Sequence, residues 1–308
     1  MKKNIYFLGL LLLAACANDD EPTGQQVQNA YPLTIEVTEN PLIPDGEEGS
    51  HTRAAITTTS SLTTFCMDYV YGTSTHGNEE ATINPAGTWD AGTWPSDAAS
   101  NGFNVDWYAH TSYTKDGSTI TSDFNLDGTN RPYISFSVVE DVSKQKDLLV
   151  ATASGTYTGT SGKLSFTFNH ACAALRFQVK KSSNLGEHSL TVSSIVLKNV
   201  VKHGQYYYDT GDWTLIITDP SKDITNYTLF SGSMTPGSSY TFLNGSENDS
   251  YLFLIPQKLT GCYVEVVWQC AGVGSGSGTA RIPLTQELVK GHKYDVKINI
   301  GNYTLTTY

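Results

Sequence analysis

KLSFTFNHACAALRFQVK, residues 163–180, contains two runs in which apolar and polar side chains alternate. The apolar members of the two runs are Leu164, Phe166 and Phe168, and then Leu175, Phe177 and Val179. A period of two residues is the signal of a β-strand with one buried face. The stretch therefore predicts two successive strands, and it sets the fold class for the rest of the chain.

The same alternation recurs between turns that are rich in Gly, Ser, Thr and Asn. Its inward residues are Phe103, Val105 and Trp107; Ile134, Phe136 and Val138; and Tyr294, Val296, Ile298 and Ile300. Helical periodicity is almost absent. Many short strands without helices predict an all-β fold of two consecutive antiparallel β-sandwich domains. We place these domains at residues 54–183 and 184–308, because the pattern is interrupted at residues 182–186.

Composition limits the partners. The chain has 308 residues and a formal net charge of −11, which argues against nucleic acid, because phosphate binding requires clustered Lys and Arg. Four cysteines besides Cys16 show no CxxC spacing, which disfavours a zinc or redox centre. They are Cys66, Cys172, Cys262 and Cys270. We expect buried apolar side chains, and a disulfide remains the open alternative.

The N-terminus predicts export. Lys2 and Lys3 precede an apolar run at residues 5–13 that is too short to span a bilayer, so residues 1–15 are interpreted as a cleaved signal peptide. Leu13-Ala14-Ala15-Cys16 resembles the lipobox of bacterial lipoproteins, in which the cysteine becomes an acylated N-terminus. The resemblance implies lipidation at Cys16 and attachment to the outer membrane. The alternative is an ordinary signal peptide that happens to contain a cysteine.

Residues 16–53 form an acidic leader. One strand, residues 31–39, is predicted within it, with Leu33, Ile35 and Val37 on its apolar face. A loop rich in Pro, Gly and acidic residues follows and ends near Arg53, the only basic residue between Lys3 and Lys115. We expect the strand to be buried and the loop to be accessible.

No catalytic set is recognisable. The seven histidines are dispersed and form no HExxH motif, no GxSxG elbow is present, and no metal or cofactor is expected. Asp209-Thr210-Gly211 lacks the second copy that an aspartic protease needs, and residues 272–278 lead into a strand rather than a helix, as in a hairpin loop. Trp89 and Trp94 lie near Gly and Pro residues and are candidate glycan contacts, although core packing explains tryptophans equally well.

The chain resembles the fimbrillin family, the type V pilus subunits of Bacteroidales. The carriers of the resemblance are the lipobox, Thr52-Arg53-Ala54, Trp94-Pro95 before residues 103–110, the stretch 164–175, Ile255-Pro256-Gln257 and residues 291–300. The resemblance implies two transthyretin-like sandwiches and cleavage by an arginine-specific protease between Arg53 and Ala54. Cleavage would remove the only strand upstream of the loop and leave an unpaired edge, which readily accepts a strand from another chain.

These features predict a non-enzymatic fimbrial subunit that is exported as a lipoprotein, matured at Arg53 and assembled with other fimbrial subunits by strand exchange for adhesion to a host or bacterial receptor. Stalk subunits of the family end in an extended donor segment, whereas only residues 301–308 follow the last predicted strand, which favours a tip or accessory role. The alternative from another functional class is a monomeric outer-membrane lipoprotein that binds glycans.

Overall fold

The computed structural model describes residues 31–44, 54–55, 62–72, 74–111, 122–159, 163–243, 251–271, 276–301 and 305–307. The regular structure of these residues is mostly β-strand, with two short α-helices, α1 (Ser96–Asn101) and α2 (Pro220–Asp223), and two 3-10 turns, η1 (Val142–Lys144) and η2 (Ser183–Leu185). The predicted all-β class is confirmed. In the described part of the chain, no helix has the length and apolar character needed to cross a membrane.

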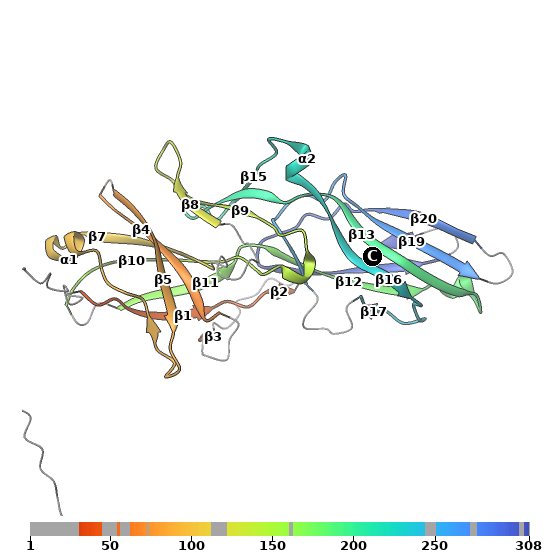
Figure 1. Ribbon diagram of the computed structural model, residues 1–308, viewed down its shortest axis with the longest axis horizontal. Coiled ribbons are helices and arrows are strands. Elements are labelled where there is room, and N and C mark those ends of the chain that lie inside the picture. Colours follow the sequence, from red (N-terminus) through yellow and green to blue (C-terminus); the bar gives the residue numbers. More distant parts are fainter. Residues whose placement is uncertain are drawn as a thin grey trace, which may run out of the picture. The chain divides into compact units, whose positions relative to one another are not determined.

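An eight-stranded sheet carries the first core, with its strands in the order β3-β1-β11-β10-β7-β4-β5-β6 (Figure 1). Their bounds are β1 Thr34–Glu39, β3 Ala54–Ala55, β4 Thr64–Tyr71, β5 Ser74–Ile83, β6 Trp89–Asp90, β7 Asn104–His110, β10 Leu149–Thr156 and β11 Lys163–His170. The pair of β1 and β11 is parallel, whereas the other neighbouring pairs of this sheet are antiparallel.

This sheet folds over onto itself. Strands β4 and β11 are three positions apart in the strand order, which in a flat sheet would separate them by about 14 Å. The ring of Phe65 on β4 nevertheless lies 4.9 Å from the ring of Phe168 and 5.9 Å from that of Phe166, both on β11. One face of the sheet therefore encloses a core, and the alternating residues of its strands fill that core.

Three further sheets build the second core. Their strand orders are β17-β12-β21-β2, with β18 beside β12 and β22 beside β21; β16-β13-β19-β20; and β15-β14-β9-β8. The bounds are β2 Ile43–Pro44, β8 Ser122–Leu126, β9 Pro132–Ser137, β12 Ala173–Lys181, β13 Ser189–Val201, β14 His203–Tyr207, β15 Trp213–Leu215, β16 Ile224–Met234, β17 Thr241–Phe242, β18 Leu252–Leu254, β19 Tyr263–Ala271, β20 Gly276–Pro283, β21 His292–Ile300 and β22 Leu305–Thr307.

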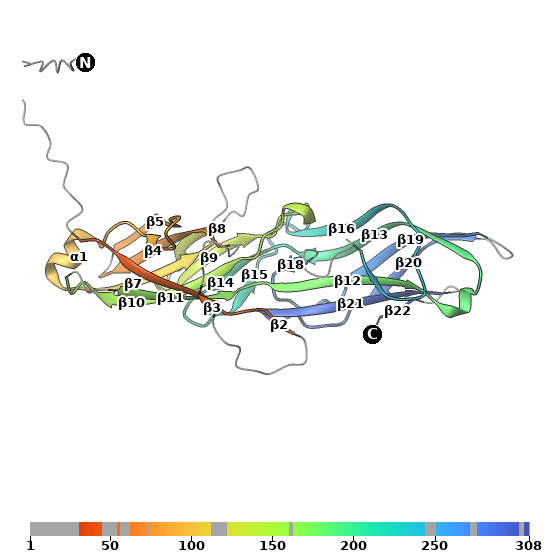
Figure 2. The same cartoon turned by 90° about the horizontal axis from the view of Figure 1, so that it is seen from below.

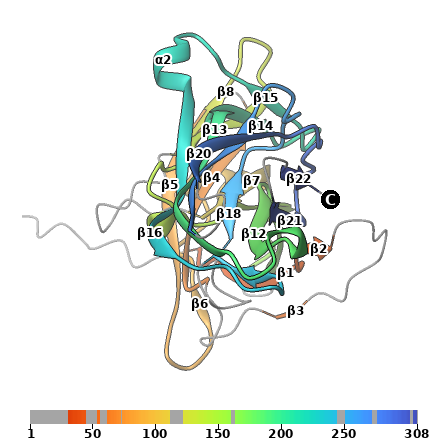
Figure 3. The same cartoon turned by 90° about the vertical axis from the view of Figure 1, so that its right-hand side faces the viewer.

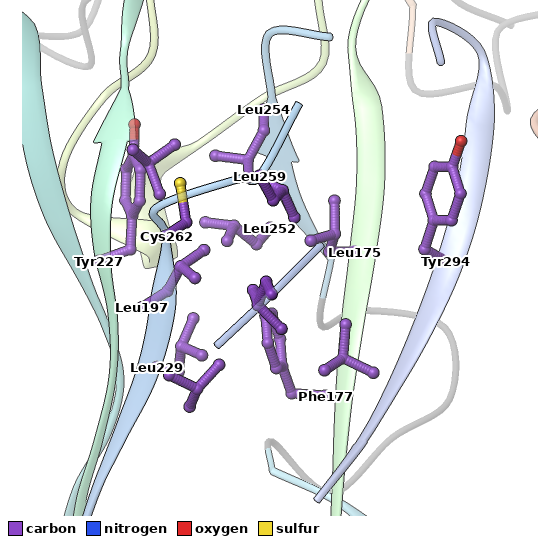
Figure 4. Packing of buried hydrophobic residues seen from close by; sticks show 14 of the residues in the cluster. Leu175, Phe177, Leu197, Tyr227, Leu229, Leu252, Leu254, Leu259, Cys262 and Tyr294 are labelled. Carbon is purple, nitrogen blue, oxygen red and sulfur yellow. The ribbon is translucent and has the colours of Figure 1, made fainter. Parts of the chain in front are cut away.

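The second core lies between the sheet of β12 and the sheet of β13. Figure 4 shows Leu175 and Phe177 from β12 facing Leu197 from β13 and Leu229 from β16, with Leu252 between them. The alternation in residues 175–179 predicts a strand with one buried face, and β12 confirms this prediction. Its inward face enters an apolar interior in which Leu175 is fully buried.

The predicted domain division needs correction. Strand β12 pairs with β21 over eight residues, from Ala174 opposite Lys293 to Lys181 opposite Ile300, and β9 pairs with β14. Two sheets thus cross the boundary at residues 183/184 within the described residues. Residues 183–185 are the turn η2, which joins β12 to β13 on the two opposing sheets of one core. Its polar residues mark a turn inside a sandwich rather than a linker between domains.

Individual side chains mostly follow the predicted pattern. Val105 and Trp107 on β7 are buried, but Phe103 precedes the strand and is 52% exposed, which corrects its expected place on the inward face. The four cysteines in the described residues are all buried, and none of them forms a disulfide; they are Cys66, Cys172, Cys262 and Cys270. They serve as small apolar side chains, as the absence of paired spacing indicates.

Candidate functional site

The candidate site is the edge of β11 together with the segment that covers it. We refer to residues 31–44 as the docked segment. Within it, β1 adds to β11 through six residue pairs, from Thr34 opposite Lys163 to Glu39 opposite Phe168. On the other side of β1, the described residues of β3 contribute two pairs. Figure 2 shows β1 running along this edge.

The inward face of β1 enters the first core. Leu33, Ile35 and Val37 are only 5%, 7% and 4% exposed. They pack in the cluster that contains Phe166 and Phe168 of β11. Burial of three such side chains contributes about 1.5–3 kcal/mol each, as an upper estimate. The docked segment is therefore an integral part of the first core.

The start of the docked segment joins the two ends of the folded sheet. The backbone N–H of Leu33 donates to the carbonyl of Gly92 at 3.0 Å, and the N–H of Trp94 donates to the carbonyl of Tyr31 at 2.8 Å. Gly92 and Trp94 directly follow β6, the strand at the opposite end of the sheet order. The ring of Tyr31 also meets that of Tyr157 edge-on at 5.1 Å. The segment thus closes a sheet that would otherwise be open on this side.

The end of the docked segment reaches the second core. The Asn40 N–H donates to the carbonyl of Phe168 at 2.9 Å, and the Asn40 amide donates to Asn169 Oδ1 at 2.7 Å. Strand β2 then pairs with the start of β21, with Ile43 opposite His292 (Figure 3). The Ile43 N–H donates to the carbonyl of Gly291 at 2.8 Å. A single segment therefore covers a strand edge in the sheet of β11 and another in the sheet of β21.

The outward face of β1 makes polar contacts in solvent. Glu36 forms an ion pair with Lys163 at 2.8 Å, and both side chains are about half exposed. The Thr38 hydroxyl donates to Thr167 Oγ1 at 3.1 Å. Exposed pairs of this kind are worth little, because water and salt screen them.

The inward face ends in a charge cluster. Glu39 Oε1 lies 3.5 Å from His170 Nε2, and His170 Nδ1 is hydrogen-bonded to Asp147. The side chains are 23%, 11% and 12% exposed in the order Glu39, His170, Asp147. Cys172 lies close to Asp147, and burial keeps the pKa of its thiol well above the ordinary value of 9.0. One ring nitrogen of His170 thus faces the body of the protein, and the other faces the docked segment.

The cluster favours bound protons. Burial raises the pKa of Glu39 above 4.5 and that of Asp147 above 3.8, although the charge of His170 opposes both shifts. Burial by itself would lower the pKa of His170. The hydrogen bond that His170 donates to Asp147 and the charges of Asp147 and Glu39 outweigh it, so the pKa of His170 is raised above 6.5. The arrangement suits an imidazolium held between two carboxyl groups.

The site residues predicted from the sequence differ in where they lie in the structure. Cys16 and Arg53 lie outside the described residues, and Ala54 pairs with Glu39 at the start of β3. Trp89 is partly buried, with its ring 5.0 Å from that of Phe65. Trp94 is only 2% exposed and packs edge-on against Trp107, so it is a core residue and does not offer a face to a sugar. This corrects the expectation of a glycan contact at Trp94.

Other sequence candidates have structural roles. Asp209 accepts two hydrogen bonds from the Arg131 guanidinium, at 2.8 and 3.1 Å, and so connects the turn after β14 to the residue before β9. Strands β19 and β20 form the antiparallel hairpin that the glycine-rich run predicts, but residues 276–278 of that run belong to β20 rather than to the loop. Among the described residues, no group of three or more His, Cys, Asp or Glu side chains is arranged to hold a metal ion.

The sequence interpretation missed the cluster of Glu39, His170 and Asp147. One signal was available, because Glu39 has the same parity as Leu33, Ile35 and Val37 and so belongs to the inward face of the strand. An acidic residue on an inward face requires a partner. The sequence could not name that partner, because His170 lies on a distant strand.

Comparisons with known proteins agree with this fold. A family model described as fimbrillin-like matches residues 52–308. A fimbrial protein from Bacteroides vulgatus superposes with a TM-score of 0.58 at 18% identity, covering 90% of this chain and 98% of its own. A candidate cell adhesion protein from Bacteroides ovatus gives 0.52 at 15% identity, covering 91% and 96%. Among curated proteins, none matches the sequence.

Proposed function

We propose, from the premise that this chain belongs to the fimbrillin-like family, that it is a subunit of a cell-surface fimbrium that assembles by strand exchange. The observation that carries the proposal is the docked segment. It covers a strand edge of the first core, yet the chain that follows it leads to Arg53, which the family resemblance implies is a cleavage site. The role is structural and adhesive rather than enzymatic.

The processing scheme follows from the order of features along the leader. Cys16 would carry the lipid that holds the precursor at the outer membrane, where stable attachment requires more than one acyl chain. Cleavage between Arg53 and Ala54 would separate the lipid and the docked segment from the rest of the chain. The family match begins at residue 52, so it covers the part that would remain.

Loss of the docked segment would change the first core in two ways. It would leave the edge of β11 without its six parallel pairs, and it would vacate the sites of Leu33, Ile35 and Val37. An exposed strand edge next to an apolar slot is a strong acceptor for a strand of another chain. The mature subunit would therefore take a replacement strand from a neighbouring subunit.

Substitution of the cleavage site tests the proposal. Arg53→Ala should abolish incorporation into fimbriae while the precursor still folds, because a loop substitution costs little stability. Arg281→Ala is the matched control, because Arg281 is an exposed arginine whose contacts are an ion pair with Glu265, at 3.3 Å, and the ring of Tyr263, 5.1 Å away. Fimbriae sheared from cells would be probed for the subunit and its N-terminal residue sequenced. Normal incorporation of Arg53→Ala with residues 31–44 still attached would contradict strand exchange.

A monomeric glycan-binding lipoprotein is the competing function. Its sequence basis was Trp89 and Trp94, and Trp94 is buried in the first core. The N-terminal residue on intact cells separates the two functions. Ala54 favours the fimbrial subunit, whereas acylated Cys16 on every copy favours the monomer.

A further inference from the structure

The groove under the docked segment has one polar end. The inward side chains of the segment follow the order Leu33, Ile35, Val37, Glu39. The first three meet apolar residues, whereas the fourth meets His170, the last residue of β11. The groove therefore distinguishes its fourth position from the other three.

His170 is held from the body side by a group that the docked segment does not supply. Asp147 lies just before β10 and is hydrogen-bonded to Nδ1 of His170. This bond fixes the ring and directs Nε2 toward the carboxyl group of Glu39, 3.5 Å away. Both members of the body pair are only about one-tenth exposed. The pair therefore persists in the body whichever strand occupies the groove.

We propose that His170, positioned by Asp147, selects the strand that replaces the docked segment, and that this strand carries a carboxyl group, which shares a proton with His170, two residues after the last of its three inward apolar residues. The inference rests on the strand-exchange function proposed above and specifies the partner. The occupant is a strand of another subunit with the inward pattern apolar, apolar, apolar, acidic.

The chemistry of the other possible occupants supports this choice. An apolar side chain at the fourth position would leave the buried Nε2–H of a protonated His170 without an acceptor, which is costly. A lysine or arginine would place a second cation against the ring. The last eight residues given, GNYTLTTY at 301–308, contain no acidic side chain, so this segment of a second copy fits the groove poorly.

Peptide exchange on the full chain tests the selection. The precursor would be nicked after Arg53 with an arginine-specific protease, and the cut position would be verified by intact mass. Fluorescent peptides of residues 31–44, YPLTIEVTENPLIP, would then compete with the nicked leader, followed by anisotropy. The Glu39→Gln peptide should bind about tenfold more weakly than the native peptide, and the Glu39→Lys peptide about hundredfold more weakly.

The matched control is the Glu36→Gln peptide, which removes the same charge from the outward face of the same strand. It should change binding by about twofold, because the Glu36 pair with Lys163 is exposed. In the body, His170→Gln should remove the preference for Glu over Gln at the fourth position. Because the peptide series leaves the protein unchanged, the result does not depend on the folding of that variant.

The outcomes separate the two proposals. Binding of all 31–44 peptides with equal affinity would overturn selection by His170 and leave strand exchange intact. Tight binding of the 301–308 peptide would also overturn it and identify a second copy as the occupant. Failure of every peptide to enter the groove would overturn strand exchange, and the selection with it.

Discussion

Strands β1 and β21 are both added parallel to a strand that lies far away in the sequence, yet they are held differently. Strand β21 pairs with β12 over eight residues, and its other side is partly covered by β2 and β22. Strand β1 pairs with β11 over six residues and, within the part of the chain that the structure describes, has two pairs with β3 on its other side. The first arrangement suits a permanent part of a sheet, and the second suits a strand at a replaceable edge.

The inward faces of β1 and β21 also differ in their residue types. The inward residues of β21 are apolar or aromatic along the whole strand, namely Tyr294, Val296, Ile298 and Ile300. Those of β1 are apolar until Glu39, which ends the face beside His170. An alternating pattern therefore does not distinguish a permanent strand from a replaceable one. Two other features distinguish β1 from β21. The connection after β1 leads to Arg53, and the inward face of β1 ends in a charged residue, Glu39.

The largest expected difference is in the free energy of unfolding when an inward isoleucine is truncated to alanine in each of the two strands. Ile298→Ala should lower the free energy of unfolding by about 2–5 kcal/mol, because Ile298 is fully buried between paired strands. Ile35→Ala should cost less, about 1–3 kcal/mol, because an edge strand can detach locally while the rest stays folded.

Urea unfolding would measure both costs, and the rate of cleavage at Arg53 would measure local detachment. Ile35→Ala should accelerate cleavage under native conditions, whereas Ile298→Ala should not do so until unfolding begins. Equal acceleration by the two substitutions would show that β1 is no more detachable than β21, and the contrast between the strands would then fail.

The sequence predicts the strands but not their partners. Alternation identifies the inward residues Leu33, Ile35 and Val37, because the period of a strand is local. It cannot tell that β1 pairs with β11 rather than with another strand, because every strand with one apolar face shows the same alternation. The misplaced boundary at residues 183/184 has a related cause, since a polar turn between two sheets of one core resembles a linker.

The functional residues show the same limit. The flanking Gly92 and Pro95 correctly place Trp94 outside regular strands, but the backbone bond between Trp94 and Tyr31 draws its ring into the core. Only long-range contacts produce that burial. The cluster around His170 is likewise assembled from β1, β11 and the irregular segment before β10, so no local motif contains it.

The pH should affect how stably β1 is docked, whereas β21 should stay paired at every pH between about 6 and about 8. The raised pKa of His170 stabilises the folded chain fully below its ordinary value of 6.5, and this contribution is lost as the pH rises through the folded value. Asp147 supplies the larger part of the shift, and the part that depends on docking comes from Glu39, whose charge favours the imidazolium. The raised pKa of Glu39 acts in the same direction, since its contribution is lost as the pH rises above 4.5 through the folded value. Asp147 also binds its proton more tightly than usual, and the nearby Cys172 thiol stays neutral.

The docked segment should therefore detach more readily at about pH 8 than at about pH 6. Hydrogen exchange of residues 34–39 in the uncleaved chain, corrected for the intrinsic pH dependence, measures this by comparison with residues 294–300. His170→Gln should remove most of the difference. Protection of β1 that is independent of pH, or a loss shared equally by β21, would contradict the role of the cluster.

The smallest effect should come from the outward face of β1. Glu36→Gln removes the ion pair with Lys163 at 2.8 Å, but each partner is about half exposed, so the cost should lie between about 0.2 and 1 kcal/mol and fade at high salt. The same change at Glu39 should cost more, because its partner His170 is only 11% exposed. Urea unfolding and cleavage at Arg53, each at low and at high salt, measure both variants. If Glu36→Gln destabilised docking as strongly as Glu39→Gln, then the total charge of the segment would govern its docking. The inward position of Glu39 would in that case have no special role.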